Sequence, residues 1–223
     1  MPPPSVIAID GPGASGKTTV GRILARKLGY RFIDTGEMYR ALTWLALKEG
    51  IDLSDEGRLA RLAAGTTIEI ACHDGTGYNP VLVDGVDVTS AIRSSQVEAA
   101  VSAVSRVPRV RQALVAQQRA LAEPGRVIVA GRDIGTVVLP QADLKVFLLA
   151  SAEERARRRY EEQTGGKRQD YGAILAGLRR RDQIDSQRSL SPLRPAEDAR
   201  VIDTEGLSPE QVANLILGLI GEG

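Results

Sequence analysis

The chain has 223 residues, which is long enough for one large domain, or one domain with an insertion, around a substantial core. Its 29 lysines and arginines balance 28 aspartates and glutamates, so it lacks the excess positive charge of a general nucleic-acid or membrane-surface binder. With one cysteine and one histidine, the sequence excludes an intramolecular disulfide and a zinc site built on several histidines.

Two strand-to-helix units open the chain. An apolar run at 6–9 ends at Asp10 and is followed by glycines, and apolar residues then recur with helical spacing over 20–28. The segment 31–36, "RFIDTG", predicts a second strand that ends in a turn, and 36–49 is rich in helix-forming residues. The N-terminus lacks the features of a signal peptide, and no apolar stretch reaches about 18 residues, so we expect a soluble, cytoplasmic protein.

The sequence pattern changes near residue 54, where the strand-to-helix units give way to short segments. After a short helical piece, "TTIEIA", "VLVDG" and "VDVTS" predict small antiparallel strands, joined by turns that include "CHDGTGYNP". A helical pattern follows over 96–122 and is interrupted at Pro108. We therefore predict a core formed by 1–53 and 106–223, with an insertion at 54–105.

The second half returns to alternating strands and helices. Strands are expected at "RVIVAGRD", "DLKVFLLA" and "ARVIDT", and helices at 151–163 and 171–185, joined by the glycine-containing connection "QTGGKRQD". The last helix has Ser208 as its N-cap, Pro209 at its first position and Gln211 to complete a capping box. This alternation predicts an α/β fold with a parallel sheet covered by helices.

The segment "GPGASGKT", residues 11–18, matches the phosphate-binding loop motif G-x-x-x-x-G-K-[ST], and it lies between an apolar strand and a helix, as that motif requires. Backbone amides and the helix N-terminus can bind phosphate oxygens, Lys17 can reach the β- and γ-phosphates, and Thr18 can ligate Mg²⁺. The alternative is an ordinary glycine turn. The expected ATP-binding residues of this loop are Gly11, Pro12, Gly13, Ala14, Ser15, Gly16, Lys17, Thr18 and Thr19.

Other motifs narrow the class of P-loop protein. The only asparagines, Asn79 and Asn214, precede Pro80 and Leu215, so the guanine-reading Asn-Lys-x-Asp motif is missing. No apolar strand ends in the Asp-Glu pair typical of ATPase motors. A kinase for a small phosphorylated acceptor, in contrast, needs positive charge around two sets of phosphates.

Arginines cluster on the two helices predicted at 151–163 and 171–185. If the second helix continues to Arg188, then Arg181, Asp185 and Arg188 share one helical face; the arginines at 155, 158 and 159 form a second stripe. One interpretation is a solvated surface with Arg–Asp pairs. The other is a lid, at about 155–185, that closes over phosphates and excludes water.

Taken in order, "GPGASGKT", "IDTGEMYR", "PRVR", "AGRDIGT" and "RRDQIDSQR" resemble the bacterial cytidylate (CMP/dCMP) kinases of the nucleoside monophosphate kinase superfamily. The resemblance runs from Val6 to the last helix. It implies a P-loop kinase core with a five-stranded parallel sheet, a monophosphate-binding insertion with small antiparallel strands, and a short lid. Gly13-Ala14 departs from many relatives, which have glycine at the second position, and Ile184 replaces an arginine found in some.

The same resemblance implies the acceptor site. Thr35, Arg40 and Arg132 are expected to hold the phosphate of CMP. Ser102, Arg111 and Asp133 are expected to read cytosine, with Arg109 as a rival to Arg111. Near the ribose and phosphate, the expected residues are Arg181, Asp185 and Arg188. An aspartate can accept from the exocyclic amino group of cytosine, where uracil has a carbonyl.

The expected reaction is transfer of the γ-phosphoryl group of ATP to CMP or dCMP. Lys17, Mg²⁺ and the arginines at 132, 155, 158 and 159 are expected to stabilise the transferring group, with Arg155 also on the ATP. Asp10, Asp133 and Asp34 are alternatives for the carboxylate that orders the water shell of Mg²⁺. A kinase for another small acceptor, such as shikimate, and a non-catalytic nucleotide-binding module remain alternatives, and we expect a monomer with no nucleic-acid or membrane partner.

Overall fold

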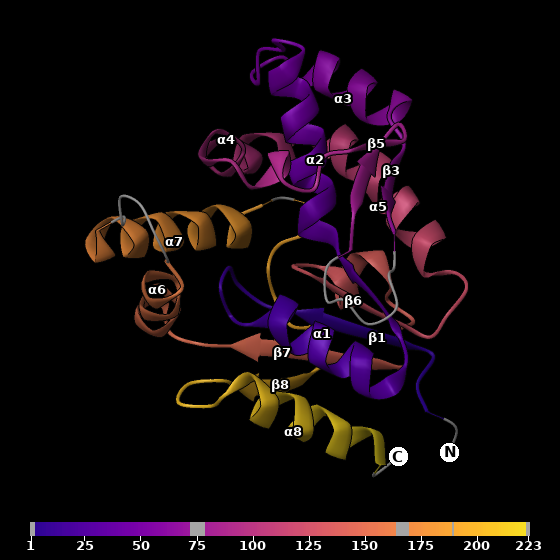
Figure 1. The fold of residues 1–223 in the computed structure, drawn as a ribbon, viewed down its shortest axis with the longest axis vertical. Coiled ribbons are helices and arrows are strands. Elements are labelled where there is room, and N and C mark those ends of the chain that lie inside the picture. Colours follow the sequence, from indigo (N-terminus) through magenta and orange to yellow (C-terminus); the bar gives the residue numbers. More distant parts are fainter. Residues whose placement is uncertain (1–2, 72–78, 164–169, 189, 222–223) are drawn as a thin grey trace. The chain divides into compact units, whose positions relative to one another are not determined.

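The computed structural model describes residues 3–71, 79–163, 170–188 and 190–221. Most of its helices and strands are labelled in Figure 1, where the colours follow the sequence. The elements in sequence order are β1 (Val6–Asp10), α1 (Lys17–Leu28), β2 (Arg31–Asp34), α2 (Thr35–Lys48), α3 (Glu56–Gly65), β3 (Ile68–Ile70), β4 (Val81–Val83), β5 (Val86–Asp87), η1 (Ala91–Arg93), α4 (Ser95–Ser105), α5 (Pro108–Ala122), β6 (Val127–Gly131), η2 (Ile134–Val138), β7 (Leu144–Leu149), α6 (Ala152–Glu161), α7 (Tyr171–Ser186), β8 (Arg200–Asp203) and α8 (Pro209–Gly221).

The chain forms two compact units, Met1–Tyr30 with Arg126–Gly223, and Arg31–Gly125. The larger sheet has five strands in the order β2-β6-β1-β7-β8, and its β1–β6, β1–β7 and β7–β8 pairs are parallel. A smaller sheet has the order β3-β4-β5, and both of its pairs are antiparallel. The predicted α/β fold, with its five-stranded sheet and small antiparallel sheet, is confirmed.

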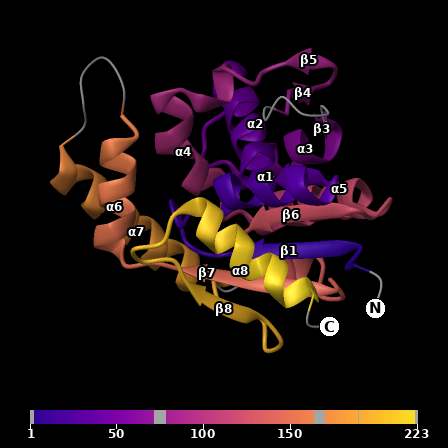
Figure 2. The ribbon, with the colours of Figure 1, turned by 60° about the horizontal axis from the view of Figure 1, so that its bottom comes forward.

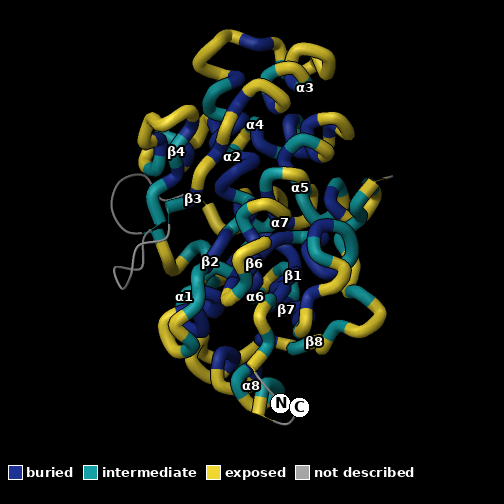
Figure 3. The backbone as a smooth tube through the Cα atoms, turned by 90° about the vertical axis from the view of Figure 1, so that its right-hand side faces the viewer, coloured by how far each residue is buried: buried dark blue, intermediate teal, exposed yellow. Residues whose placement is uncertain are grey.

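Burial explains the composition of the central strands. All five residues of β6 are buried, as are four of the five in β1, and both strands can be followed in Figure 3. A parallel strand covered on both faces has no solvent side, so it needs a nearly continuous apolar run. The edge strand β8 is mostly exposed. The register pairs Asp10 with Gly131, which brings the end of β1 next to the segment that follows β6.

Within the first unit, helices α1 and α8 pack against each other, as do α6 and α7, and both pairs can be followed in Figure 2. The α6–α7 contact contains the buried residues Ala156, Ile174 and Leu178, with Ala14 of the phosphate-binding loop packed against them. The loop therefore rests on the two helices that follow β7.

The second unit has its own core. Helix α2 packs against α4, α5 and the small sheet, and α3 packs against α5. Asp34 caps α2 by accepting a hydrogen bond from the amide of Gly36 at 3.0 Å, and Pro108 occupies the first turn of α5. The largest fully buried side chains of this unit are Ile33, Met38, Leu42, Leu59, Ile92 and Leu114.

The predicted helices and strands are confirmed to within a few residues. The turn-rich segment at 72–78 and the lid connection at 164–169 lie outside the described residues. The domain boundaries at 53 and 106 stay a prediction: the second compact unit, Arg31–Gly125, contains the whole predicted insertion together with β2 and α2. In the described part of the chain, no helix is long and apolar enough to cross a membrane.

The N-terminal cap of α8 provides a test of local stability. The Ser208 hydroxyl accepts from the amide of Gln211 at 3.2 Å, and the Gln211 side chain accepts from the amide of Ser208 at 2.8 Å. We expect Ser208→Ala to lower the free energy of unfolding by about 1 kcal/mol, and Ser208→Gly by only a few tenths. Urea denaturation followed by circular dichroism measures both, and equal losses in the two variants would contradict the role of the cap.

Candidate active site

The phosphate-binding loop connects the end of β1 to the start of α1, and the amides at a helix N-terminus can bind an anion. Gly11 has φ +148°, and a Cβ there would lie 2.4 Å from the carbonyl oxygen of Leu148 in the neighbouring strand. Gly16 has φ +90° at the N-cap of α1. Ala14 also has a positive φ, 60°, in the left-handed region that favours glycine. The departure noted at this position therefore keeps the backbone conformation that a glycine adopts easily.

Lys17 lies inside this loop. Its Nζ donates to the carbonyl oxygen of Pro12 at 2.6 Å and to the hydroxyl of Ser15 at 3.4 Å. The residue is buried, and folding the loop back around its ammonium group keeps the charge solvated by protein oxygens. The ammonium group is thereby held among the backbone amides expected to bind phosphate.

A cavity of about 490 Å³ opens beside the loop. One wall is formed by 14–20, which includes Lys17, Thr18 and Thr19. Two other walls come from α6 and from the segment after β8: their lining residues are Glu154, Arg157, Arg158, Glu162, Thr204, Gly206, Leu207, Ser208, Pro209 and Val212. The cavity places polar groups at the loop and apolar side chains at 207, 209 and 212, as a nucleotide with charged phosphates and a flat base requires.

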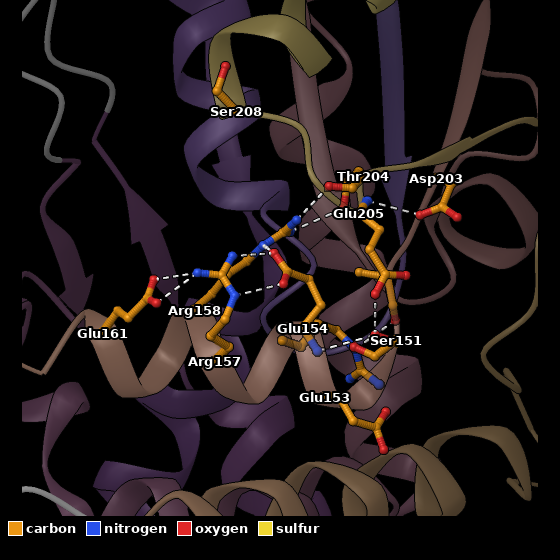
Figure 4. A network of polar contacts seen from close by, with 12 residues as sticks. Ser151, Glu153, Glu154, Arg157, Arg158, Glu161, Asp203, Thr204, Glu205 and Ser208 are labelled. Carbon is orange, nitrogen blue, oxygen red and sulfur yellow. Dashed lines mark hydrogen bonds and ion pairs between the residues drawn. The ribbon is translucent and has the colours of Figure 1, made fainter.

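Arg158 lines the cavity next to the phosphate-binding loop and is held there by two residues, Glu154 and Thr204, which Figure 4 shows. Its Nε donates to Glu154 at 2.8 Å, and its two terminal nitrogens donate to the hydroxyl and carbonyl oxygens of Thr204 at 3.1 and 2.5 Å. A Cβ on Gly16 would lie 3.9 Å from Arg158 Nη1. Hydrogen bonds from Arg157 and then from Arg158 hold the pKa of Glu154 below its ordinary value, so its carboxylate stays charged.

The other two arginines of the predicted stripe lie elsewhere. Arg155 is buried and donates to the carbonyl oxygen of Gly13 at 3.1 Å and to both oxygens of Asp182 at 3.2 and 2.6 Å. Arg159 lies near the end of α6, is partly buried, and is not among the residues that line the cavity. Arg157 lines it instead. The predicted roles of Arg155 and Arg159 stay predictions.

Asp10 anchors the turn after β6. Its two carboxylate oxygens accept from the amides of Ile134 at 2.8 Å and Gly135 at 2.7 Å. Burial raises the pKa of Asp10 to about 6; the two amides and Lys17 lower it, and the neighbouring charge of Asp133 raises it. Asp133 is itself buried at the start of η2. Two of the three candidate carboxylates thus meet beside Lys17, whereas Asp34 caps α2.

Asp185 forms ion pairs with two of the arginines that were predicted to bind the acceptor nucleotide. It is 1% exposed, accepts from Arg132 Nε at 2.9 Å, and pairs with Arg188, which lies just beyond the end of α7. Burial by itself raises the pKa of Asp185, but the charges of Arg132, Arg188 and Arg181 outweigh it, and the pKa lies below its ordinary value. A Cβ on Gly13 would lie 3.3 Å from Arg132 and 4.0 Å from Arg181. This cluster therefore borders the phosphate-binding loop.

The second unit contains the other predicted acceptor residues. Thr35 is buried in the first turn of α2, and Arg40 on the same helix forms an ion pair with Glu98 of α4. Arg111 of α5 is buried, donates to the carbonyl oxygen of Ser105 at 3.2 Å, and stacks over the Tyr39 ring at 5.4 Å.

Ser102 lies one turn before Ser105, whose hydroxyl donates to the Ser102 carbonyl oxygen at 3.4 Å. The rival Arg109 is exposed. Thus Arg40, Ser102 and Arg111 lie on three helices that pack against one another.

Sequence reasoning missed three residues that bind the arginines of α6. Glu154 precedes Arg157 and Arg158 by three and four residues, a spacing that could have indicated the pairs. Thr204 follows the last strand of the sheet, where ligands of parallel sheets bind, and that position was a usable signal. Asp182 meets an arginine 27 positions away on another helix, and nothing in the sequence indicates that contact.

A phosphate-binding loop at the carboxyl end of a central parallel strand, a nucleotide-sized cavity beside it and arginines from the following helices define a P-loop phosphotransferase. A family model described as "Cytidylate kinase" matches residues 7–222, and the chain belongs to that family. The chain is 51% identical to a cytidylate kinase of Bacillus subtilis over 213 residues, which cover 95% of this chain and 94% of the relative.

A second relative supports the same family, and one solved structure supports the same fold. A cytidylate kinase of Rhodococcus opacus is 49% identical over 219 residues, which cover 97% of this chain and 95% of the relative. Among solved structures, a gluconokinase from Sinorhizobium meliloti superposes with a TM-score of 0.53 at 16% identity, over 98% of this chain and 93% of that one. The comparison with the gluconokinase shows the P-loop kinase fold alone. Membership of the cytidylate kinase family does not favour the alternative that this chain is a non-catalytic nucleotide-binding module.

The pKa of Asp10 gives a pH-dependent prediction. Because folding raises this pKa from 3.8 to about 6, the protonated form is the one that the fold favours. Its contribution to stability is therefore full below about pH 4 and is lost as the pH rises through about 6. Carbon-detected NMR of the side-chain carboxyl should show a midpoint near pH 6.

Three variants isolate the causes of this shift. Asp133→Asn removes a neighbouring negative charge and should lower the midpoint of Asp10, whereas Lys17→Met removes a positive charge and should raise it. Asp34→Asn, which changes the cap of α2, is the matched control and should leave it unchanged. A midpoint near 4 in the unaltered protein would show that the carboxyl is not desolvated as described.

Proposed function

We propose that this chain transfers the γ-phosphoryl group of ATP to CMP or dCMP, giving ADP and CDP or dCDP. The observation that carries the proposal is membership of the cytidylate kinase family over residues 7–222. The cavity at the phosphate-binding loop and the arginine cluster around Asp185 support it, because a transfer between two phosphates needs positive charge on both the donor side and the acceptor side.

On the donor side, backbone amides of the loop and Lys17 bind the phosphates of ATP, and the base enters the cavity beside Leu207, Pro209 and Val212. Among the described residues, no group of three or more acidic, histidine or cysteine side chains could hold a metal ion. Mg²⁺ in kinases is bound largely by substrate phosphates, so the Thr18 hydroxyl in the cavity wall fits such a site. When bound there, Mg²⁺ neutralises charge on the β- and γ-phosphates.

On the acceptor side, Arg132, Arg181 and Arg188 bind the phosphate and ribose of CMP together with Asp185. Asp133 reads the cytosine amino group. In the second unit, Thr35 and Arg40 contribute to phosphate binding, and Ser102 and Arg111 to recognition of the base. An aspartate facing an exocyclic amino group leaves an unpaired acceptor when uracil replaces cytosine, so Asp133 in this role discriminates against UMP.

The transfer needs no general base, because the acceptor phosphate is already an anionic nucleophile at neutral pH. Charge on the transferring group is spread over its equatorial oxygens, and stabilisation comes from groups placed before the reaction starts. Lys17 and Arg158 are held by the protein at the loop, and Arg132 borders it. Arg159 and Arg155 complete the proposed set.

We propose a monomer that works in the cytoplasm, with nucleotides as its only partners. The single cysteine suits a reducing compartment, and the near-neutral charge balance of 29 basic and 28 acidic residues offers no general surface for nucleic acid or anionic lipid.

The first experiment is an ADP-release assay with ATP and Mg²⁺, in which CMP, dCMP, UMP, AMP, GMP, TMP and shikimate are supplied one at a time. We expect strong turnover with CMP and dCMP, and turnover at least about 100-fold weaker with the others, because the buried polar groups of the pocket penalise a wrong base. Strong turnover with another acceptor would retain the kinase and remove the cytosine pocket. No turnover with any acceptor would contradict the proposed reaction.

Replacement of Asp185 separates acceptor use from donor binding. Asp185→Ala leaves Arg132 and Arg188 without their buried counter-ion, so we expect the KM for CMP to rise by at least about tenfold while the Kd for ATP changes less than about twofold. Steady-state kinetics and titration calorimetry measure the two quantities. Unchanged CMP kinetics in a folded variant would remove Asp185 from the acceptor site.

A further inference from the structure

Helix α7 carries a second aspartate, Asp182, that the proposed reaction does not use. It lies three residues before Asp185, and its side chain is 24% exposed. Both of its oxygens accept from Arg155 of α6, at 3.2 and 2.6 Å. The Arg155 side chain is only 4% exposed, and Asp182 is the carboxylate that it contacts directly, so loss of Asp182 leaves a buried charge without its hydrogen-bonded counter-ion.

Arg155 connects that carboxylate to the phosphate-binding loop. Its Nε donates to the carbonyl oxygens of Ala150 at 3.0 Å and Ser151 at 3.2 Å, which fixes the guanidinium group to the end of β7. Its Nη1 donates to the carbonyl oxygen of Gly13 at 3.1 Å. The planar guanidinium group therefore joins three segments: the connection after β7, the phosphate-binding loop and α7.

The bond to Gly13 matters because a peptide group is planar. Fixing the carbonyl oxygen of Gly13 also fixes the direction of the amide hydrogen of Ala14, which belongs to the same peptide plane. Ala14 holds φ +60°, a conformation that costs about 1 kcal/mol or more for a non-glycine residue, so the surrounding structure must maintain it. Ala14 packs against the buried α6–α7 cluster, and Arg155 restrains the peptide group that precedes it.

We propose that Asp182 is a positioning residue for the phosphate-binding loop: acting through Arg155, it orients the Gly13–Ala14 peptide so that the Ala14 amide faces the phosphates of ATP. This inference rests on the proposed ATP site and adds a residue that touches no substrate. Loss of Asp182 leaves a buried arginine without its carboxylate, and the arginine then reorients toward water or toward other oxygens. In either case the Gly13 carbonyl loses a fixed donor.

A purely structural role is the competing explanation, in which Asp182 only holds α6 against α7. The chain provides a matched control, because Arg179 of α7 and Glu153 of α6 form another ion pair between the same two helices. That pair is 61% and 54% exposed and makes no contact with Gly13 in the bonds described. Glu153→Gln therefore removes an α6–α7 ion pair and a weaker long-range charge near Arg155, while the hydrogen bonds of Arg155 to Asp182 and Gly13 stay in place.

The test compares Asp182→Asn with Glu153→Gln by calorimetric titration with ATP and MgCl₂ in the absence of CMP. For Asp182→Asn we expect the Kd for ATP to rise by about five- to thirtyfold, with the Kd for CMP changed less than about twofold. Glu153→Gln should change both constants less than about twofold. The amide resonance of Ala14 in the ATP-free protein should move in Asp182→Asn and stay in place in Glu153→Gln.

A double-mutant cycle tests whether Asp182 acts through Arg155. The background variant is Arg155→Lys, which keeps a positive charge but cannot bind both oxygens of Asp182 and the carbonyl oxygen of Gly13 at the same time. In this background, Asp182→Asn should have less than half of its single-variant effect on log Kd. Asp182→Glu keeps the charge and should give an intermediate Kd; it replaces Asp182→Asn if that variant does not fold.

Three results would overturn the proposal: an unchanged Kd for ATP in folded Asp182→Asn, additive effects in the cycle, or an equal loss of ATP affinity in Glu153→Gln. These outcomes are distinct from failure of the proposed function. If the unaltered protein fails to phosphorylate CMP, the reaction is wrong; if it phosphorylates CMP and Asp182→Asn binds ATP normally, only the positioning role is wrong.

Discussion

A site that joins two phosphorylated molecules must hold several positive charges close together before any substrate arrives to neutralise them. Like charges brought together in a partly desolvated space repel one another and lose hydration, so each needs a counter-charge from the protein. Within the unit that contains the phosphate-binding loop, the carboxylates supply it: Asp185 pairs with Arg132 and Arg188, Asp182 with Arg155, and Glu154 with Arg158.

This pairing explains why the arginine-rich segments do not give the chain a basic character. The overall balance of 29 basic and 28 acidic residues reflects, in part, carboxylates placed next to the arginines of the proposed site. The pairs also differ in kind. Arg155 uses its hydrogen-bond donors on protein oxygens deep in the fold, whereas Arg158 lines the cavity and is bound by Glu154 and Thr204 at its edge. Two arginines from one predicted stripe thus have different surroundings: Arg155 binds protein oxygens, and Arg158 lines the cavity.

Much of the fold could be predicted because its signals are local. The loop 11–18 follows a buried strand and opens a helix, and the capping box at Ser208 and Gln211 marks the start of α8. Helical spacing also indicated that Arg181 and Asp185 share a face. Contacts between distant segments could not be predicted in this way. The sequence does not indicate that Asp10 accepts from the amides of Ile134 and Gly135, because parallel pairing of β1 with β6 creates that proximity.

The limits of the phosphate-binding motif follow from Gly13. The motif leaves this position free, yet a Cβ there would lie 3.3 Å from Arg132 Nη2, which is closer than an ordinary contact, and 3.6 Å from Leu178 of α7, which is an ordinary packing distance. The loop and α7 have thus become a matched pair of surfaces. Transplanting the eight residues "GPGASGKT" into another P-loop scaffold would transfer the sequence without the helix that shapes it. The portable unit in this protein is the loop together with α6 and α7, and a chimaera designed around the motif alone would inherit an unsupported turn.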